Sequence, residues 1–260
     1  MGGTLERHSP PVWRSPSAEL SLGRADVHVW RLSLEQNPEQ TKACRDLLSP
    51  DELERADRFL RSEHGAHFAV SRGALRILLG HYLSREPDGL SFRYGARGKP
   101  SLGQPLGSDI QFNLSHSAGL AIFAFSRGRR LGADIEGGDR RVAPEQIARR
   151  FFSPREVADL ESLPPASRKQ AFLHCWTRKE AYLKAIGSGL SAGLGGFSVS
   201  LRSGEPAHLL EIDGQPGEAG RWRMQDLAPG EGYAAALCVE GAEWELRCLD
   251  GRLPVDLPRR

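Results

Sequence analysis

The chain contains 260 residues, of which 39% are hydrophobic and 26% are charged, and its formal net charge is +2. This length predicts one large domain or two of modest size, and this share of apolar residues is enough for a folded core. The nearly balanced charge gives no basis for recruiting a nucleic acid or a membrane surface.

Three further classes of protein, membrane-spanning, secreted and zinc-binding, are disfavoured by the sequence. The longest apolar runs, such as residues 234–239, have the length of a strand and not of a membrane-spanning helix. The first eleven residues are polar and lack the apolar region of a signal peptide. The four cysteines form no CxxC pair, which disfavours a zinc site and fits a reducing compartment. We therefore expect a cytoplasmic protein that binds no membrane.

In chain order, two segments carry the same helix-start pattern, Ser-Pro-x-Glu, at residues 49–52 and 153–156. Ser fits the N-cap, Pro fits the first helical position, and Glu closes a capping box. A longer helix is predicted after each of them, at residues 64–84 and 169–186, and Ser71-Arg72 matches Thr177-Arg178 within these helices. Apolar spacing gives each long helix one buried face: Phe68, Leu75, Leu79 and Tyr82 in the first, Phe172, Cys175, Leu183 and Ile186 in the second.

Strands are predicted at residues 110–114 and 120–125, around a turn at Ser115-His116-Ser117, and again at 197–201 and 233–239. The predicted fold class is therefore α+β with two duplicated halves. Each half would be a small, mostly antiparallel sheet packed on a long helix, with a ligand cleft between the halves. We place the halves at residues 1–131 and 132–260. The alternative is two unrelated helix starts, because capping boxes are common.

The segment Leu131–Glu136 has the strongest local signal for chemistry. On a strand, Asp134 and Glu136 project to the same side while Ile135 points into the core. Two carboxylates held close together favour a cation between them, and hard oxygen ligands suit Mg²⁺ or Mn²⁺. The alternative is a solvated strand end.

Trp176, Glu180 and Lys184 are spaced by four residues and therefore share one stripe of the second long helix. Glu180 would supply a third carboxylate beside Asp134 and Glu136, as a Mg²⁺ bound to a diphosphate requires. The alternative is an ordinary surface pair between Glu180 and Lys184, worth about 0.3 to 0.5 kcal/mol.

Two shorter motifs could hold phosphate. Ser115 and His116 offer hydroxyl, imidazole and backbone N–H donors at the predicted turn, although a structural histidine is the alternative. Only five of the 35 basic residues are lysines, and one of them, Lys99, stands between Gly98 and Pro100. Its restricted position suits a fixed phosphate contact, whereas a plain hairpin turn is the alternative.

Together these motifs resemble a known family. Residues 98–100, 113–117, 132–136, 150–153 and 176–180 follow the order and spacing of phosphopantetheinyl transferases, in the long, monomeric Sfp-type branch. The resemblance covers about residues 49–201.

The resemblance implies transfer of the 4'-phosphopantetheine arm of coenzyme A to a serine of an apo acyl or peptidyl carrier protein, with release of adenosine 3',5'-bisphosphate. By the family's pattern, Mg²⁺ is held by Asp134, Glu136 and Glu180, and Lys184 faces the same phosphates in the C-terminal half. Arg72, Lys99, Ser115 and His116 are expected to hold the nucleotide from the N-terminal half. The family's lysine-bearing loop is acidic here at Asp51, Glu52 and Glu54, which leaves Arg55 and Arg58 as possible 3'-phosphate contacts.

A serine hydroxyl needs a base, and Glu180 is the candidate, acting directly or through a metal-bound water. Two other functions stay open: a Mg²⁺-dependent phosphohydrolase and a non-catalytic module that binds coenzyme A or a carrier. The carrier, its pathway (fatty acid, polyketide or nonribosomal peptide synthesis) and its docking surface are not determined by the sequence, although Phe151 and Phe152 are candidates for docking. A monomer is expected.

Overall fold

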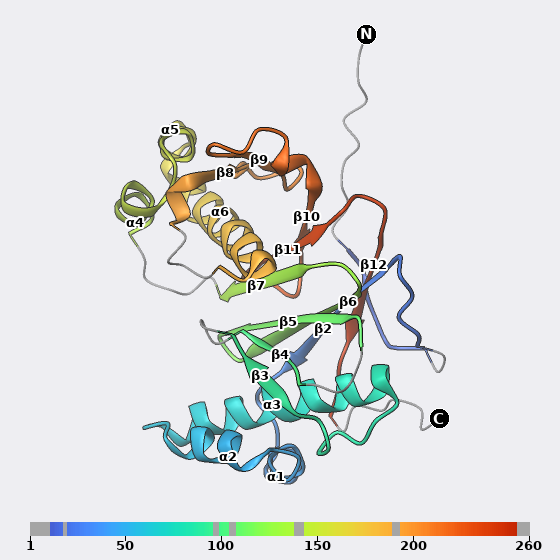
Figure 1. Ribbon diagram of the computed structural model, residues 1–260. Helices are drawn as coiled ribbons and strands as arrows, with labels where there is room; N and C mark the ends of the chain where they lie inside the picture. The colour runs from blue at the N-terminus through green and yellow to red at the C-terminus, as the bar shows by residue number, and fades with distance from the viewer. Residues whose placement is uncertain are drawn as a thin grey trace. The chain divides into compact units, whose positions relative to one another are not determined.

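The computed structural model describes residues 11–17, 20–95, 99–103, 108–137, 143–188 and 193–253. The chain divides into two units (Figure 1). The N-terminal unit comprises Trp13–Gly128 and Glu245–Arg260, and the C-terminal unit comprises Arg129–Trp244 and Met1–Val12. The predicted functional division at residue 131 stays a prediction. Among the described residues, no helix is long and apolar enough to cross a membrane.

The N-terminal unit is built on a five-stranded sheet with the order β1-β12-β2-β6-β5. Its strands are β1 (Trp13–Arg14), β2 (Asp26–Ser33), β5 (Ile110–Ser117), β6 (Leu120–Arg127) and β12 (Glu245–Asp250). β12 is parallel to β1 and β2, whereas β6 is antiparallel to β2 and β5. The other elements are α1 (Pro38–Arg45), α2 (Pro50–Asp57), α3 (Ser62–Leu83) and the hairpin of β3 (Phe92–Tyr94) and β4 (Pro100–Leu102).

The apolar face predicted for the first long helix forms the core of this unit. Leu75 and Leu79 of α3 are fully buried and cluster with Trp30 of β2 and with Phe123 and Phe125 of β6. Burying one such side chain contributes about 1.5–3 kcal/mol. This face therefore fixes α3 on the sheet.

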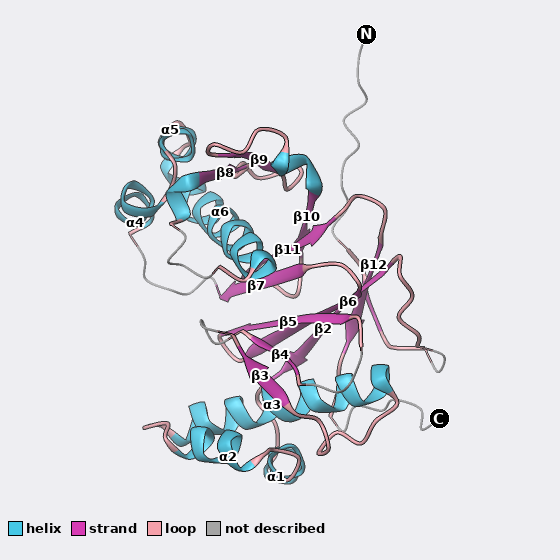
Figure 2. Cartoon of the chain, viewed as in Figure 1, coloured by secondary structure: helices cyan, strands magenta, loops and turns pink. Residues whose placement is uncertain are grey.

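The C-terminal unit contains a three-stranded antiparallel sheet with the order β10-β11-β7. These strands are β7 (Leu131–Gly137), β10 (Trp222–Leu227) and β11 (Tyr233–Glu240). Helix α6 packs along β7 and β11 (Figure 2). The other elements are α4 (Pro144–Phe151), α5 (Pro154–Glu161), α6 (Pro165–Ile186), β8 (Phe197–Val199), β9 (Leu209–Ile212) and the 3-10 turns η2 (Leu194–Gly196) and η3 (Glu218–Arg221).

The predicted duplication is confirmed by the order of elements. In each unit a strand is followed by two short helices, one 22-residue helix, a short hairpin and a long hairpin. The strand order β2-β6-β5 repeats as β7-β11-β10. Because Ser62 of α3 then corresponds to Pro165 of α6, Arg76 corresponds to Lys179. The predicted match of Arg72 with Arg178 is therefore wrong by about one helical turn. Similar short polar motifs occur in both helices, and they led to the wrong match.

Both predicted capping boxes are present. The backbone N–H of Ser49 donates to Glu52 Oε2 (3.1 Å), and that of Ser153 donates to Glu156 Oε2 (2.9 Å). A third capping box, which the sequence analysis did not predict, starts α1: the backbone N–H of Gln40 donates to Asn37 Oδ1 at 2.8 Å.

The predicted turn at Ser115-His116-Ser117 is wrong, because β5 continues to Ser117. The turn consists of Ala118 and Gly119, with φ angles of 46° and 78°. Positive φ at both positions gives the type I′ turn that matches the twist of a two-residue hairpin. Ser117 accordingly pairs with Leu120.

Candidate active site

Strand β7 presents one carboxylate face and one apolar face. Asp134 is buried, with 5% of its surface exposed, and Glu136 on the same side is half-buried. Ile135, which points to the opposite side, is 1% exposed. This alternation is the one predicted from the sequence, and it directs both carboxylates towards the side of β7 on which α6 packs.

Gly132 allows α6 to lie directly on β7. A Cβ atom at this position would be 2.2 Å from the carbonyl oxygen of Ala181 and 2.3 Å from the backbone nitrogen of Ala185. Both atoms belong to the backbone of α6 and cannot rotate away. The absence of a side chain at Gly132 therefore sets how close the helix comes to the strand that carries Asp134.

The limits of helix α6 follow from its sequence. Pro165 occupies the first turn, where its missing N–H is not needed, and Gly187 ends the helix in the left-handed conformation at φ 71°. Between these ends, Trp176, Glu180 and Lys184 share the predicted stripe. Lys184 donates from Nζ to Asp134 Oδ1 (2.6 Å) and to the carbonyl oxygen of Ala133 (3.3 Å). Lys184 is thus tied to the strand, unlike the surface pair with Glu180 considered above.

Glu180 lies in an environment that disfavours its charge. Burial, together with the negative charges of Asp134 and Glu136 and against the opposing charge of Lys184, raises the pKa of Glu180 to about 7. Its Oε1 atom is buried and has no hydrogen-bond partner among the described residues. A buried carboxylate oxygen without a partner, beside two other carboxylates, is the arrangement that a bound cation would stabilise.

These donors fit a hard divalent cation such as Mg²⁺ in their chemistry, because all three are carboxylates. In the described part of the chain, however, no three acidic, histidine or cysteine side chains are already grouped around a common metal position. Lys184 pairs with one oxygen of Asp134, Oδ1, so a positive charge already lies beside these carboxylates.

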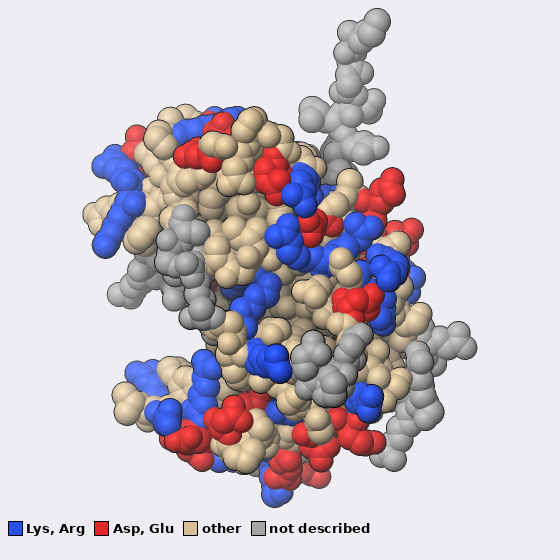
Figure 3. Space-filling view, viewed as in Figure 1, with Lys and Arg blue, Asp and Glu red and all other residues tan. Residues whose placement is uncertain are grey.

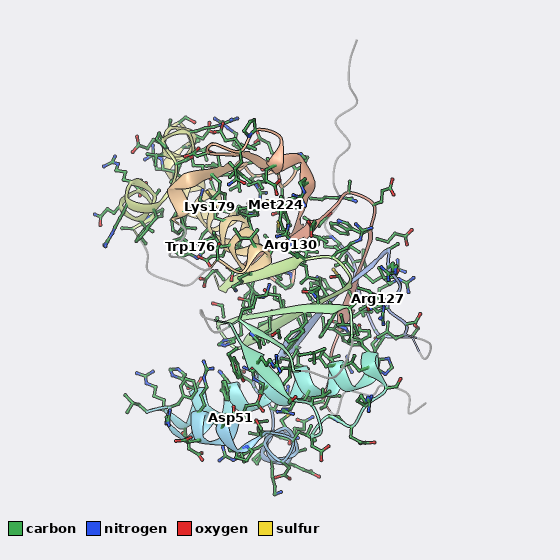
Figure 4. The ribbon with its side chains drawn as sticks, in the orientation of Figure 1. Asp51, Arg127, Arg130, Trp176, Lys179 and Met224 are labelled. Carbon is green, nitrogen blue, oxygen red and sulfur yellow. The ribbon has the colours of Figure 1, made fainter. Side chains whose placement is uncertain are left out.

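Trp176 of α6, labelled in Figure 4, belongs to a cluster of aromatic rings. Its ring lies 5.9 Å from Phe172, 6.4 Å from Phe152 and 6.5 Å from Phe151. Phe152 is only 6% exposed and stacks on Phe172 at 5.3 Å, so it is a core residue and does not form part of a docking surface. Phe151 is 38% exposed.

A buried ion pair, which the sequence analysis missed, supports the same helix. Lys179 donates to both carboxylate oxygens of Glu156 at 2.7 Å and to the carbonyl oxygen of Phe197 at 2.6 Å, and both side chains are fully buried. In the N-terminal unit, Arg76 contacts Glu52 in the same way, with 2.7 Å between Nη2 and Oε2. Both pairs share a sequence signal, the repeated capping-box Glu. Each of these two Glu residues is followed, in the next long helix, by a cation on an otherwise buried helix face.

The N-terminal unit places Arg72 among aromatic rings. Its guanidinium lies over Phe68, Phe92 and Tyr94 at 5.6, 5.4 and 5.7 Å, and its Nε lies 3.3 Å from Glu52 Oε1. The Nη1 atom is buried without a hydrogen-bond partner among the described residues. A buried guanidinium N–H in this state fits an anionic ligand such as phosphate.

The other expected nucleotide contacts come from several elements of this unit, and Arg55 meets the same Phe68 ring as Arg72. Arg55 is exposed and stacks over Phe68 at 5.1 Å, and Arg58 pairs with Glu54. Ser115 and His116 are neighbours on β5 and therefore face opposite sides of the sheet, with Ser115 8% exposed and His116 exposed. Lys99 is half-buried beside β4, and Gly98 lies outside the described residues.

Comparison with known proteins adds an independent line of evidence. Residues 130–238 match the 4'-phosphopantetheinyl transferase superfamily. The chain is 40% identical over 235 residues to the 4'-phosphopantetheinyl transferase HetI of Nostoc sp. (strain PCC 7120), which covers 90% of this chain and 96% of HetI. It is 31% identical over 163 residues to the 4'-phosphopantetheinyl transferase Sfp of Bacillus subtilis (strain 168), covering 63% of this chain and 70% of Sfp.

A shorter match, 37% identical over 112 residues, links it to the 4'-phosphopantetheinyl transferase AcpT of Salmonella typhimurium (strain LT2), covering 43% of this chain and 56% of AcpT. The match to HetI extends over nearly the whole of both chains, so it includes the strand with Asp134 and the helix with Glu180 and Lys184. The chain therefore belongs to the 4'-phosphopantetheinyl transferase superfamily and is an enzyme of that class.

Proposed function

We propose that this enzyme transfers the phosphopantetheine arm of coenzyme A to a serine of an apo acyl or peptidyl carrier protein, with Mg²⁺ as its cofactor. The serine oxygen forms a bond to the phosphorus that bears the pantetheine. The bond from that phosphorus to the bridging oxygen breaks, and adenosine 3',5'-bisphosphate leaves with this oxygen. The serine proton passes to a base.

The observation that carries this proposal is the environment of Glu180. Its carboxylate is buried, lacks a hydrogen-bond partner at Oε1 among the described residues, and has a pKa raised to about 7 by burial and by Asp134 and Glu136. A carboxylate in this position is the candidate to accept the serine proton. When bound, Mg²⁺ would offset the charge of the diphosphate and of the leaving oxygen.

The remaining residues are assigned by the chemistry that they offer. Lys184, which is tied to Asp134 at 2.6 Å, would neutralise phosphate charge beside the carboxylates. We assign phosphate and nucleotide contacts to Arg72, whose Nη1 lacks a partner among the described residues, and to Lys99, Ser115, His116, Arg55 and Arg58. We also propose that the enzyme acts as a monomer in the cytoplasm.

For the carrier protein, exposed Phe151 is the proposed docking residue. The guanidinium of Arg150 stacks over its ring at 5.1 Å, and Arg149 is exposed beside it. In Figure 3, basic side chains gather over α4, where these residues lie. An exposed aromatic ring flanked by arginines suits a partner with an apolar and acidic surface.

Mass spectrometry of apo carrier proteins incubated with coenzyme A, Mg²⁺ and the enzyme tests the proposal. The carrier is expected to gain the mass of one phosphopantetheine arm. The gain should disappear on chelation of the metal and in Asp134→Ala, whose fold is checked by circular dichroism. Release of phosphate without a change in the carrier would instead indicate a phosphohydrolase, and binding without turnover would indicate a non-catalytic module.

A further inference from the structure

A cavity of about 450 Å³ lies within the C-terminal unit, between the first half of α6, the adjoining ends of β10 and β11, and the loop at residues 203–207. None of its lining residues has been assigned a role in the transfer reaction. Met224, labelled in Figure 4, forms part of its apolar wall with Leu227 and Ala207. The cavity is large enough for a small organic molecule.

A fixed carboxylate stands at one side of this cavity. Asp226 accepts hydrogen bonds from Arg178 at both oxygens, Nε to Oδ1 at 2.9 Å and Nη2 to Oδ2 at 2.5 Å. The third nitrogen of Arg178 donates to the carbonyl oxygen of Ser200 at 2.6 Å. Arg178 is fully buried, whereas the side chain of Asp226 is 38% exposed and lines the cavity. The carboxylate is thus held rigidly and presents its outer edge to a ligand.

His174 offers a second acceptor beside this carboxylate in the tautomer that carries the ring proton on Nε2. Its Nδ1 atom lies 3.7 Å from Asp226 Oδ2, which is too far for a hydrogen bond, and Nδ1 is buried without a partner among the described residues. Burial lowers the pKa of His174, so the ring is neutral at pH 7. An N–H donor in the cavity would therefore find an imidazole nitrogen and a carboxylate oxygen side by side.

The charges around the cavity favour a positively charged ligand. Asp226 and Glu205 line it, and no Lys or Arg among the residues that the structure describes does so. The single positive charge of Arg178 lies behind Asp226 and is already paired with it. The cavity therefore has one excess negative charge next to an apolar wall. A cation with N–H donors matches the charge, and a short apolar body matches the wall.

We propose that this cavity binds a small organic cation of the amidinium or primary-ammonium class. The amidinium or ammonium group would donate to Asp226 and His174, and the apolar body would lie against Met224 and Leu227. This site is independent of the transfer reaction proposed above.

Titration calorimetry with benzamidine and with its neutral analogue benzamide tests the charge requirement, and NMR of histidine-labelled protein follows His174. Hydrogen bonds to charged groups exceed neutral ones by about 1.4 kcal/mol, so benzamidine should bind about tenfold more tightly. Benzamidine should also shift the His174 ring signals. Equal affinity for both compounds, or binding that leaves His174 unperturbed, would overturn the proposal.

Three variants locate the ligand. Glu205→Gln, at an exposed position, should weaken benzamidine but not benzamide, and Ala207→Leu should weaken both by filling the cavity. The matched control is Glu211→Gln, an exposed carboxylate of the same unit that does not line the cavity, and its affinity should equal that of the wild type. Asp226→Asn is not needed, since it would leave Arg178 buried without a counter-charge. If Glu205→Gln and Glu211→Gln behave alike and Ala207→Leu binds normally, the cation is bound elsewhere.

Discussion

Lys184 and Asp134 form an ion pair that joins helix α6 to strand β7, with 2.6 Å between Nζ and Oδ1. The side chain of Asp134 is 7% exposed and that of Lys184 is 27% exposed, so water screens the pair only partly. The ammonium therefore contacts one of the three carboxylates that we propose as metal ligands. A divalent cation at these carboxylates would lie near this positive charge.

Replacing Lys184 with Met should therefore increase the affinity of the free enzyme for Mg²⁺, because the competing positive charge is removed while the apolar stem is kept. We expect about a tenfold decrease in the Mg²⁺ dissociation constant, equivalent to about 1.4 kcal/mol, measured by titration calorimetry without coenzyme A. The rate of transfer should nevertheless fall, since phosphate charge loses a partner. An unchanged or weaker Mg²⁺ affinity in Lys184→Met would place the metal away from Asp134.

The substitution Glu180→Gln tests the role of Glu180 in the chemical step while keeping the fold. The substitution keeps the size of the side chain but removes its ability to accept a proton and one negative charge. We expect kcat to fall by about a hundredfold or more, which is typical for loss of a general base. Single-turnover measurements at saturating Mg²⁺ check this, with Glu39→Gln, an exposed residue of α1, as the control. A full rate in Glu180→Gln would show that another group accepts the proton.

Gly132→Ala should disturb the contact between α6 and β7. Its new methyl group would meet the backbone of Ala181 and Ala185 within 2.3 Å, which forces the helix away from the strand. We expect a loss of about 3 kcal/mol in the free energy of unfolding and a drop in transfer rate. Gly220→Ala is the matched control, because a Cβ there meets no atom within 4 Å. Urea denaturation of both variants decides the point, and equal stabilities would contradict the proposed role of Gly132.

The buried pair of Lys179 and Glu156 should be sensitive to the loss of one partner. Lys179→Met leaves the Glu156 carboxylate fully buried without its cation, which we expect to destabilise the fold by about 3–5 kcal/mol. Combining it with Glu156→Gln removes the uncompensated charge. The double variant should therefore be more stable than Lys179→Met alone in urea denaturation. If the two substitutions instead add their effects, the coupling between these side chains is absent.

His28 makes stability depend on pH below neutrality. Burial lowers its pKa from 6.5 to about 4, its Nδ1 lies 2.8 Å from the Tyr82 hydroxyl, and its Nε2 has no partner among the described residues. Between pH 6.5 and 4 the unfolded chain binds a proton that the folded chain does not. The free energy of unfolding should therefore fall by about 3 kcal/mol over this range and lose nothing from His28 above it.

The check is the difference between wild type and His28→Gln across pH. The amide of Gln can still accept from Tyr82 but does not titrate. The stability of the wild type relative to this variant should decrease as the pH is lowered from 6.5 towards 4. A constant difference between the two proteins would contradict the assignment.

Local sequence signals predicted the repeated fold well because they act within a few residues. The capping boxes of α2 and α5 need only Ser and Glu three positions apart, and the alternation of β7 needs only the period of a strand. The position of the turn before β6 was missed because it depends on an unusual backbone conformation that the residue type does not indicate. Ala118 adopts a φ of 46°, which few non-glycine residues do, so its sequence gives no turn signal.

The candidate site was predictable only in part. Periodicity placed Glu180 and Lys184 on one stripe of α6, but it could not show that Lys184 would pair with Asp134, fifty residues earlier in the chain. The burial of Glu156 with Lys179 was missed although the repeated capping-box Glu gave a signal, because charged residues in a helix normally face water. Such pairings depend on tertiary packing.

Strand β12 has a consequence for the order in which this protein folds during synthesis. It is made after the whole C-terminal unit, yet it lies between β1 and β2 in the sheet of the N-terminal unit. While the ribosome is still translating residues up to Trp244, β2 lacks one of its two neighbours, whereas the sheet of the C-terminal unit already has all three of its strands. The half of the chain that leaves the ribosome first is therefore the half whose sheet is completed last.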